Sequence, residues 1–297
     1  MKLLYVFGIG LLRILQSTFN KKSSVYTDKL ETKLKFGVFF ETMAAVFSLL
    51  YLFFTGTEGN LSATIICALI NGVGFLAELM TALAAMRKAP LVLCAMCSFG
   101  GGIVLPSIVG IFFFDEPMTV LQWVGVVLFF ISAWLLSTKE NSKEKSTQSI
   151  VKALPILIIN FLINGFISLL GKYYAVKVEN GNAPMYSCFS YATAAMMFGI
   201  VLLAISFNRS GKEKEPLSKN VYGYGVVLGF VCATIVCAST VMSRSIPIVV
   251  LNTIPNIICI IGCLFVSRWL FKEKITSASI LGVIAGIAST FLIITAL

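Results

Sequence analysis

Ten apolar runs of about 20 residues, separated by short polar turns, constrain this chain more than any other feature. About 20 apolar residues in a helix span the hydrocarbon core of a bilayer, where only helices and closed barrels satisfy their backbone polar groups. Charged residues make up only 12% of the sequence. Because a soluble domain carries about twice that share, we expect an all-α integral membrane protein. The predicted transmembrane helices cover 3–19, 35–54, 61–86, 90–113, 119–138, 153–171, 184–207, 221–243, 247–271 and 275–296.

A sequence repeat relates the two halves of the chain at a constant shift. FFFDEPMTVLQWVGVVLFFIS at 112–132 shares its Phe, Glu, Thr, Gly, Val and Ser with WLFKEKITSASILGVIAGIAS at 269–289. Because five spans per copy is an odd number, the second copy is inverted relative to the first, as in many secondary transporters. We therefore expect ten transmembrane helices as two five-helix inverted-topology repeats, 1–138 and 153–297, joined by a polar cytoplasmic linker at 139–152. The paired residues are Phe114 and Phe271, Glu116 and Glu273, Thr119 and Thr276, Gly125 and Gly282, Val126 and Val283, Ser132 and Ser289, Gly72 and Gly229, Arg87 and Arg244, and Pro90 and Pro247.

The repeated turn before the last helix of each half has a predicted structural role. Glu116 and Glu273 lie just before these helices, where a carboxylate complements the positive end of the helix dipole. Thr119 and Thr276 are expected to be the N-caps.

The distribution of basic residues predicts the topology. One side of the bundle receives the Lys and Arg residues of 21–35, 87–88, 139–152, 209–219 and 268–274. The other side receives only Lys2, Lys172, Lys177 and Arg244. By the positive-inside rule the basic side is cytoplasmic, so both termini are predicted to be extracytoplasmic in a multi-pass protein of the cell (plasma) membrane. The net charge of +10 therefore reflects topology, not a nucleic-acid surface.

Three ionisable residues lie inside predicted spans, where each costs roughly 2.5–3.5 kcal/mol on the insertion scale. They are Arg13, Glu41 and Glu78. In one interpretation Arg13 anchors an anionic group of a substrate, and Glu78 or Glu41 is a proton-coupling carboxylate. In the other, Arg13 forms an ion pair with a carboxylate and only fixes the helix packing. The sequence leaves both interpretations open.

Polar residues also recur at helical spacing within the spans, which places them on shared helix faces. We expect these stripes to line a substrate cavity near the bilayer midplane. Hydrogen bonding between helices, typically worth about 0.6 kcal/mol for each bond, is the alternative. The predicted cavity residues are Arg13, Gln16, Asn20, Ser98, Asn160, Asn164, Ser168, Tyr173, Asn252 and Asn256.

Two prolines fall inside predicted spans and are expected to kink them, because proline removes a helical hydrogen bond. Pro106 and Pro255 therefore predict hinges, and Gly101 in a run of three glycines is expected to soften the first one. Two GxxxG patterns, Gly225/Gly229 and Gly282/Gly286, predict close packing of helices.

The paired segments FFDEPMTVLQWVGVVLFFIS and LFKEKITSASILGVIAGIAS, together with RKAPLV and RSIPIVV, resemble the EamA-like ten-helix carriers of the drug/metabolite transporter superfamily. The resemblance covers nearly the whole chain and implies transport of small metabolites such as amino acids, sugars or nucleosides, often outward. Arg13 stands where the four-helix multidrug relatives place an acidic residue. That difference disfavours the exchange of lipophilic cations for protons.

We therefore expect a secondary active transporter for a small polar metabolite of the amino acid, sugar or nucleoside class, working by alternating access as an exporter or exchanger. Proton-coupled multidrug efflux is the alternative. An enzyme is not expected, because the chain has no His and no nucleophile–base pair. The eight Cys residues all lie in apolar runs, so no metal, cofactor or disulfide is expected. The expected partners are a small-molecule substrate and the lipid bilayer, with a monomer or homodimer as the assembly.

Overall fold

The computed structural model describes residues 2–113, 119–137, 145–208, 216–244, 248–273 and 276–294. These residues form α-helices and no strand. Helices α2, α3, α7 and α8 and residues 153–177 of α6 are long and apolar enough to cross a membrane, and α4, α5, α9 and α10 contain shorter apolar segments. The chain thus has the construction of an α-helical membrane protein. The helices are α1 (Lys2–Tyr26), α2 (Leu30–Thr55), α3 (Leu61–Lys88), α4 (Leu91–Phe113), α5 (Val120–Ser137), α6 (Lys145–Lys177), α7 (Ala183–Asn208), α8 (Lys219–Met242), α9 (Ile248–Trp269) and α10 (Ser277–Ile294).

Every predicted span coincides with one of these helices, but the predicted linker is too long. α6 begins at Lys145, so 145–152 is helical and only 138–144 lies outside the described residues. A helix can continue beyond the membrane through polar residues, because residues such as Lys145 and Gln148 are good helix formers in water. α1 likewise continues to Tyr26, beyond its predicted end at 19.

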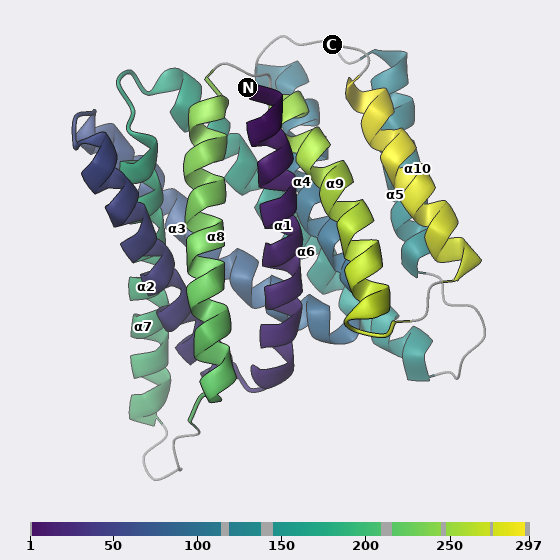
Figure 1. The fold of residues 1–297 in the computed structure, drawn as a ribbon, viewed down its shortest axis with the longest axis horizontal. Coiled ribbons are helices and arrows are strands. Elements are labelled where there is room, and N and C mark those ends of the chain that lie inside the picture. The colour runs from purple at the N-terminus through teal and green to yellow at the C-terminus, as the bar shows by residue number, and fades with distance from the viewer. Residues whose placement is uncertain are drawn as a thin grey trace.

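The helices form one bundle, with α2 and α7 at one edge and α5 and α10 at the other (Figure 1). Between these edges, α1 packs against α8 and α9, while α6 packs against α3 and α4. Likewise α3 packs against α7 and α8 against α2, and α4 contacts α9. If α1–α5 are matched in order with α6–α10, each of these contacts has a counterpart. The contact of α1 with α9 corresponds to that of α6 with α4, α1 with α8 to α6 with α3, and α3 with α7 to α8 with α2, while α4 with α9 corresponds to itself. α1 begins and α10 ends at the same end of the bundle.

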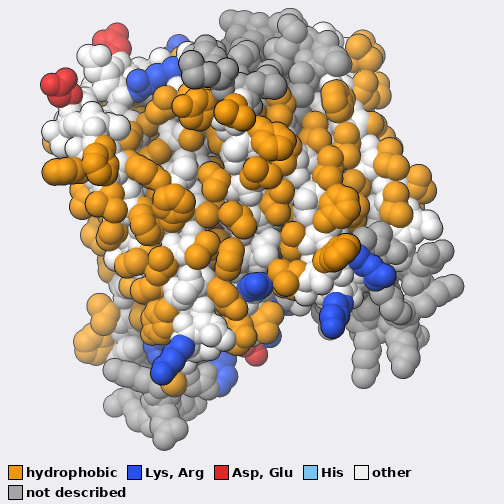
Figure 2. Space-filling view, in the orientation of Figure 1, with side chains coloured by type: hydrophobic (Ala, Val, Ile, Leu, Met, Phe, Trp, Pro, Cys, Tyr) orange, Lys and Arg blue, Asp and Glu red, His pale blue; other side chains and the backbone are white. Residues whose placement is uncertain are grey.

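The outer surface of the bundle is apolar. Phe53, Phe54 and Trp269 are each more than four-fifths exposed, at 82%, 82% and 83%. Figure 2 shows hydrophobic side chains over most of one face, with a few Lys and Arg side chains at its upper left and most of them near its lower edge. That edge is the end at which α1 ends and α2 begins, and we call it the basic end. Such a surface suits lipid around the middle of the bundle and water at its ends.

Repeated residues make reciprocal contacts where α5 packs against α10. The Ser132 hydroxyl on α5 donates to the backbone carbonyl of Gly282 on α10, at 2.5 Å. The Ser289 hydroxyl on α10 donates to the carbonyl of Gly125 on α5, at 2.8 Å. Ser132 and Ser289 are repeat partners, and so are Gly125 and Gly282. Each half therefore supplies the same donor and the same acceptor.

Repeated residues play equivalent parts elsewhere too. A Cβ at Gly72 would lie 2.6 Å from the Thr193 side chain on α7, and one at Gly229 would lie 2.7 Å from that of Met43 on α2. Both glycines thus permit a close approach of two helices. At the ends of α3 and α8, the repeat partners Arg87 and Arg244 each donate to a backbone carbonyl of a neighbouring interhelix connection.

The predicted N-caps are confirmed. Thr119 accepts from the backbone N–H of Gln122 at 3.4 Å, and Gln122 returns a side-chain bond to the N–H of Thr119 at 2.8 Å. Thr276 accepts from the N–H of Ser279 at 3.1 Å. Glu116 lies outside the described residues.

Candidate functional site

A cavity of about 160 Å³ lies inside the bundle and is lined by α1–α4 and α6–α9. A cavity of similar volume holds one benzene molecule, so the space suits a solute of roughly six to ten non-hydrogen atoms. Its lining is rich in polar side chains and also includes the aromatic rings of Phe40, Phe75 and Phe99. The polar lining residues are Arg13, Gln16, Glu41, Asn71, Glu78, Ser98, Asn164, Ser168, Lys172, Tyr186, Tyr191, Ser239, Thr240, Ser243 and Asn252.

The cavity reaches toward one end of the bundle only. Tyr186 lies in the first turn of α7, and Ser243 directly follows α8. Both positions are at the end where α1 begins and α10 ends. Toward the basic end the lining stops well inside the bundle, at Gln16 on α1 and Ser98 on α4.

Arg13 is held at the cavity wall by two asparagines of α9 and one aromatic ring of α4. One terminal guanidinium nitrogen donates to the Asn256 side-chain oxygen, and the other donates to that of Asn252 at 3.3 Å. The guanidinium carbon lies 4.9 Å from the centre of the Phe99 ring, a cation–π contact. Among the described residues, no ion pair joins Arg13 to Glu41 or Glu78.

Pro106 supplies an acceptor that anchors α9 beside Arg13. A proline has no N–H, so the carbonyl four residues earlier, that of Gly102, loses its helical partner. This carbonyl instead accepts from the Asn252 side-chain amide at 2.9 Å and from the Ser168 hydroxyl at 3.2 Å. The Asn252 amide also contacts the Ser168 hydroxyl at 2.9 Å. One freed carbonyl therefore joins α4, α6 and α9 at the cavity.

The predicted hinge residues lie within continuous helices. α4 runs through Pro106 and α9 through Pro255 without interruption. A Cβ at Gly101 would lie 1.9 Å from the Phe161 carbonyl oxygen on α6, so the absence of a side chain lets α4 and α6 touch. Gly101 therefore has a packing role, and its predicted role as a hinge stays a prediction.

Two carboxylates, Glu41 of α2 and Glu78 of α3, occupy another part of the cavity wall. They lie near enough to each other, and to Tyr191 and Cys232, to interact electrostatically. Glu41 is only 1% exposed, and its Oε2 has no hydrogen-bond partner in the described part of the chain. Tyr191 stacks on Phe75 with 4.5 Å between ring centres, so aromatic rings adjoin the carboxylates.

Several buried polar atoms at the cavity wall lack a partner from the described residues. They belong to five lining residues: Arg13 (Nε), Glu41 (Oε2), Asn71 (Oδ1), Tyr186 (OH) and Ser239 (Oγ). Buried polar groups in folded proteins are almost always hydrogen-bonded, since leaving one unpaired costs about 1–3 kcal/mol. The residues that carry these atoms surround one cavity, although the atoms themselves are buried within its wall.

Six of the ten predicted cavity residues line this cavity, as do Glu41 and Glu78. The six are Arg13, Gln16, Ser98, Asn164, Ser168 and Asn252.

The other four lie elsewhere. Asn20 is buried two helical turns beyond Arg13, about 10 Å further along the axis and past the end of the lining. Tyr173 is 51% exposed on the outer surface, because five residues beyond Ser168 turn it about 140° away from the cavity. Asn160 bonds to Ser98 and, at 2.8 Å, to Thr81.

Asn256 holds Arg13 and donates to the Phe99 carbonyl at 2.9 Å. Asn160 and Asn256 are each 1% exposed, so the hydrogen-bonding alternative describes both.

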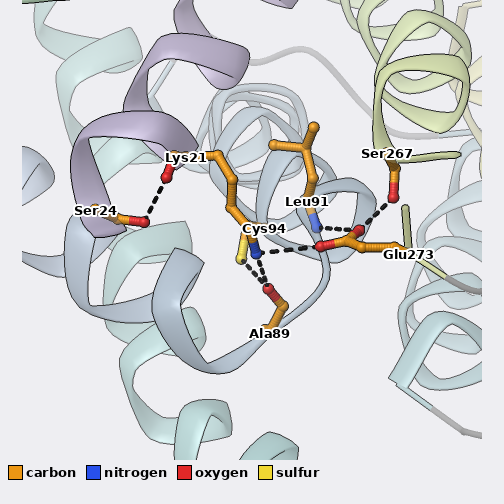
Figure 3. A network of polar contacts seen from close by, with 7 residues as sticks. All are labelled: Lys21, Ser24, Ala89, Leu91, Cys94, Ser267 and Glu273. Atoms are coloured by element: carbon orange, nitrogen blue, oxygen red, sulfur yellow. Dashed lines mark hydrogen bonds and ion pairs between the residues drawn. The ribbon is translucent and has the colours of Figure 1, made fainter. Parts of the chain in front are cut away.

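A network of polar contacts surrounds Glu273, where α1 and α9 end and α4 begins (Figure 3). Lys21 of α1 forms an ion pair with Glu273 at 3.2 Å and donates to the Ala89 carbonyl at 2.8 Å. Glu273 also accepts from the Leu91 backbone N–H at 3.2 Å and from the Ser267 hydroxyl. We call these five residues the Glu273 network; it ties α1 and the end of α9 to the start of α4.

The predicted partner of Glu273 was wrong. Its carboxylate accepts from the first N–H of α4, and α4 packs beside α9, the helix that ends just before Glu273. The general rule about helix dipoles holds, but the helix is a different one.

Sequence reasoning missed several lining residues, some of which left a signal. Asn71 was missed although it lies seven residues before the predicted Glu78 on α3 and so shares its helix face. Ser239 and Ser243 were also missed, and they lie four residues apart at the end of α8 and share a face as well. Tyr186 gave no such signal, because nothing in the sequence distinguishes a cavity-lining tyrosine from a packed one.

No family model and no curated protein matches this chain. Among solved structures, 28 chains match. One of them, described only as the crystal structure of a protein, covers 98% of this chain and 96% of its own length, with a TM-score of 0.66 and 11% sequence identity. The likeness extends the fold over nearly the whole chain, and at this identity it carries no function.

Proposed function

We propose that this protein is a secondary active transporter that moves a small polar metabolite across the membrane by alternating access. The observation that carries the proposal is the central cavity, whose lining includes Arg13, Glu41 and Glu78 inside a bundle with an apolar outer surface. Polar and ionisable groups are costly at membrane depth and are characteristic of substrate and ion pathways. A metabolite carrier of the EamA-like kind remains our proposal for the family.

The two halves are proposed to be inverted repeats of five transmembrane helices each. The reciprocal Ser132–Gly282 and Ser289–Gly125 bonds support this, since a two-fold relation makes the same contact twice. Two similar halves can exchange conformations at little cost in free energy, so one cavity opens to either side in turn.

The cavity's position suggests which state is present. It extends toward the end where the chain begins and ends, and the Glu273 network lies beyond its other end. With the basic end in the cytoplasm, this is a state closed toward the cytoplasm, and both termini are extracytoplasmic. The plasma membrane is the proposed location, and export or exchange the proposed direction.

Proton-coupled multidrug efflux is a second candidate, favoured by the aromatic lining. Phe40, Phe75 and Tyr191 adjoin the two carboxylates, an arrangement that attracts lipophilic cations. Arg13 in the same cavity opposes a cationic substrate, so we rank metabolite transport first.

A ligand screen followed by transport tests the proposal. Purified protein is screened by thermal shift against amino acids, sugars, nucleosides and lipophilic cations such as tetraphenylphosphonium, since a ligand of the folded state raises the melting temperature. Any hit is then tested for counterflow in proteoliposomes. We expect saturable flux that Glu78→Gln and Asn164→Ala reduce. Flux that rises linearly with concentration indicates a channel, and a stabilising hit among the lipophilic cations alone supports efflux.

A further inference from the structure

The cavity is lined by two cationic side chains, Arg13 and Lys172, and two carboxylates, Glu41 and Glu78, and among the described residues no ion pair joins Arg13 to either carboxylate. Arg13 is bound by the neutral amides of Asn252 and Asn256, and its Nε has no partner there. Glu41 has an unpartnered Oε2 while 1% exposed, and Glu78 faces the same cavity without a hydrogen bond to its carboxylate from the described chain. A buried ion is costly unless a counter-charge and hydrogen bonds satisfy it.

The two kinds of charge belong to different walls. Arg13 is tied to α4 and α9 through Phe99 and the two asparagines. The carboxylates come from α2 and α3 and adjoin Tyr191 of α7. Arg13 is thus held on its own wall by neutral contacts, which leaves its charge to be matched from within the cavity.

We infer that the substrate is a small zwitterion that carries a primary ammonium group and a carboxylate. Its carboxylate is matched to the guanidinium of Arg13, and its ammonium group to the carboxylates of Glu41 and Glu78 beside the rings of Phe75 and Tyr191. This inference rests on the proposed function and names the substrate class of the same cavity.

Other metabolite classes match the wall less well. A neutral sugar or nucleoside would leave Arg13 without a counter-charge in a desolvated space. An organic cation without a carboxylate would satisfy Glu41 but adjoin Arg13 unfavourably, and an organic anion would do the reverse. The volume of about 160 Å³ also favours a molecule of single amino acid size.

Isosteric probes test each charge separately. Binding to the purified full-length chain is measured by isothermal titration calorimetry with glycine, serine and valine. The matched probes are valinamide, which keeps only the ammonium group, and 2-hydroxy-3-methylbutanoate, which keeps only the carboxylate. We expect at least one zwitterion to bind, and loss of either charged group to weaken binding about 10- to 100-fold, as for hydrogen bonds between charged groups.

Variants assign each group to its wall. In Arg13→Gln we expect valine and valinamide to bind equally, because the carboxylate has lost its partner. In Glu41→Gln we expect the binding affinities for valine and for the hydroxy acid to differ much less than in the wild type. Lys22→Gln on α1 and Glu31→Gln on α2 make the same charge changes on the same helices outside the cavity lining, and we expect both to keep the wild-type preferences.

The inference is overturned if no zwitterion binds, if either single-charge probe binds the wild type as tightly as valine, or if Arg13→Gln weakens valine and valinamide by the same factor. Saturable counterflow of a sugar or nucleoside with no zwitterion binding would reject the substrate class but keep the transporter. The absence of saturable flux for every class screened would reject the transporter itself.

Discussion

Breaking the Glu273 network should open the basic end of the bundle. Lys21→Met or Glu273→Gln removes an ion pair of 3.2 Å whose side chains are only 13% and 22% exposed. Two unit charges at that distance attract by about 5 kcal/mol at an effective dielectric constant of about 20. Desolvation of both ions offsets most of this, which leaves about 2 kcal/mol for a mostly buried pair. A change of that size shifts an equilibrium between closed and open states about 30-fold.

Cys94 is a native reporter of that opening. Its thiol lies in the same cluster, 3.9 Å from the Ala89 carbonyl oxygen that also binds Lys21, and the residue is 1% exposed (Figure 3). We expect N-ethylmaleimide to label Cys94 about 10- to 30-fold faster in either variant, since the labelling rate follows the open fraction. The measurement is peptide mass spectrometry of timed labelling reactions, which separates Cys94 from the other cysteines.

Lys22→Met is the matched control, because it removes the neighbouring positive charge of α1 without touching Glu273. Combining Lys21→Met with Glu273→Gln should add little to either single change, since both remove the same ion pair. Unchanged labelling of Cys94 in both single variants, or an equal rise in the control, would refute the idea that this ion pair keeps the basic end closed.

Three further outcomes follow from the packing and the topology. Gly101→Ala should lower the melting temperature by several degrees, because the new Cβ would overlap the Phe161 carbonyl oxygen, whereas Gly199→Ala, with nothing within 4 Å, should not; equal melting temperatures by nanoscale differential scanning fluorimetry would contradict the close contact. Ser132→Ala and Ser289→Ala should each destabilise the fold by a similar amount, about 0.5–1.5 kcal/mol, as measured by denaturant unfolding in micelles; clearly unequal losses would show that the two bonds are not equivalent. Epitope tags at the two ends of the chain should both be reached by antibody on intact cells, and access to only one of them would contradict the predicted topology.

The helices were predictable because membrane spans leave a strong signal, namely length and apolar composition. Their ends were not, as the helical extension from Lys145 illustrates. Apolar composition identifies the helical residues that lie in lipid, and it gives no information about helical residues that lie in water. The repeat was visible for a similar reason, since Ser132, Ser289 and the capping threonines have roles that few other residues can fill.

The cavity was predictable only in part. Periodicity places Arg13 and Gln16 on one helix face, but it does not tell whether that face meets a cavity or another helix. Asn160 and Asn256 illustrate the difference, because both fit a polar stripe and both bind neighbouring side chains instead. The Glu273 contact with α4 depends on the direction of the turn that follows α9, and no local sequence pattern predicts that direction.

The reciprocal Ser132–Gly282 and Ser289–Gly125 bonds between α5 and α10 have a consequence for how such a chain could arise. An ancestral five-helix half, inserted in both orientations, would already hold both partners of that contact and could pair with itself. Strict symmetry would then force every charge to occur twice. In the present chain the positions matching Arg13, Glu41 and Glu78 are Leu170, Phe198 and Ile235, so the charged groups occur once each. On the proposed inverted-repeat architecture, fusion of two halves into one polypeptide would permit such an unequal pair of walls.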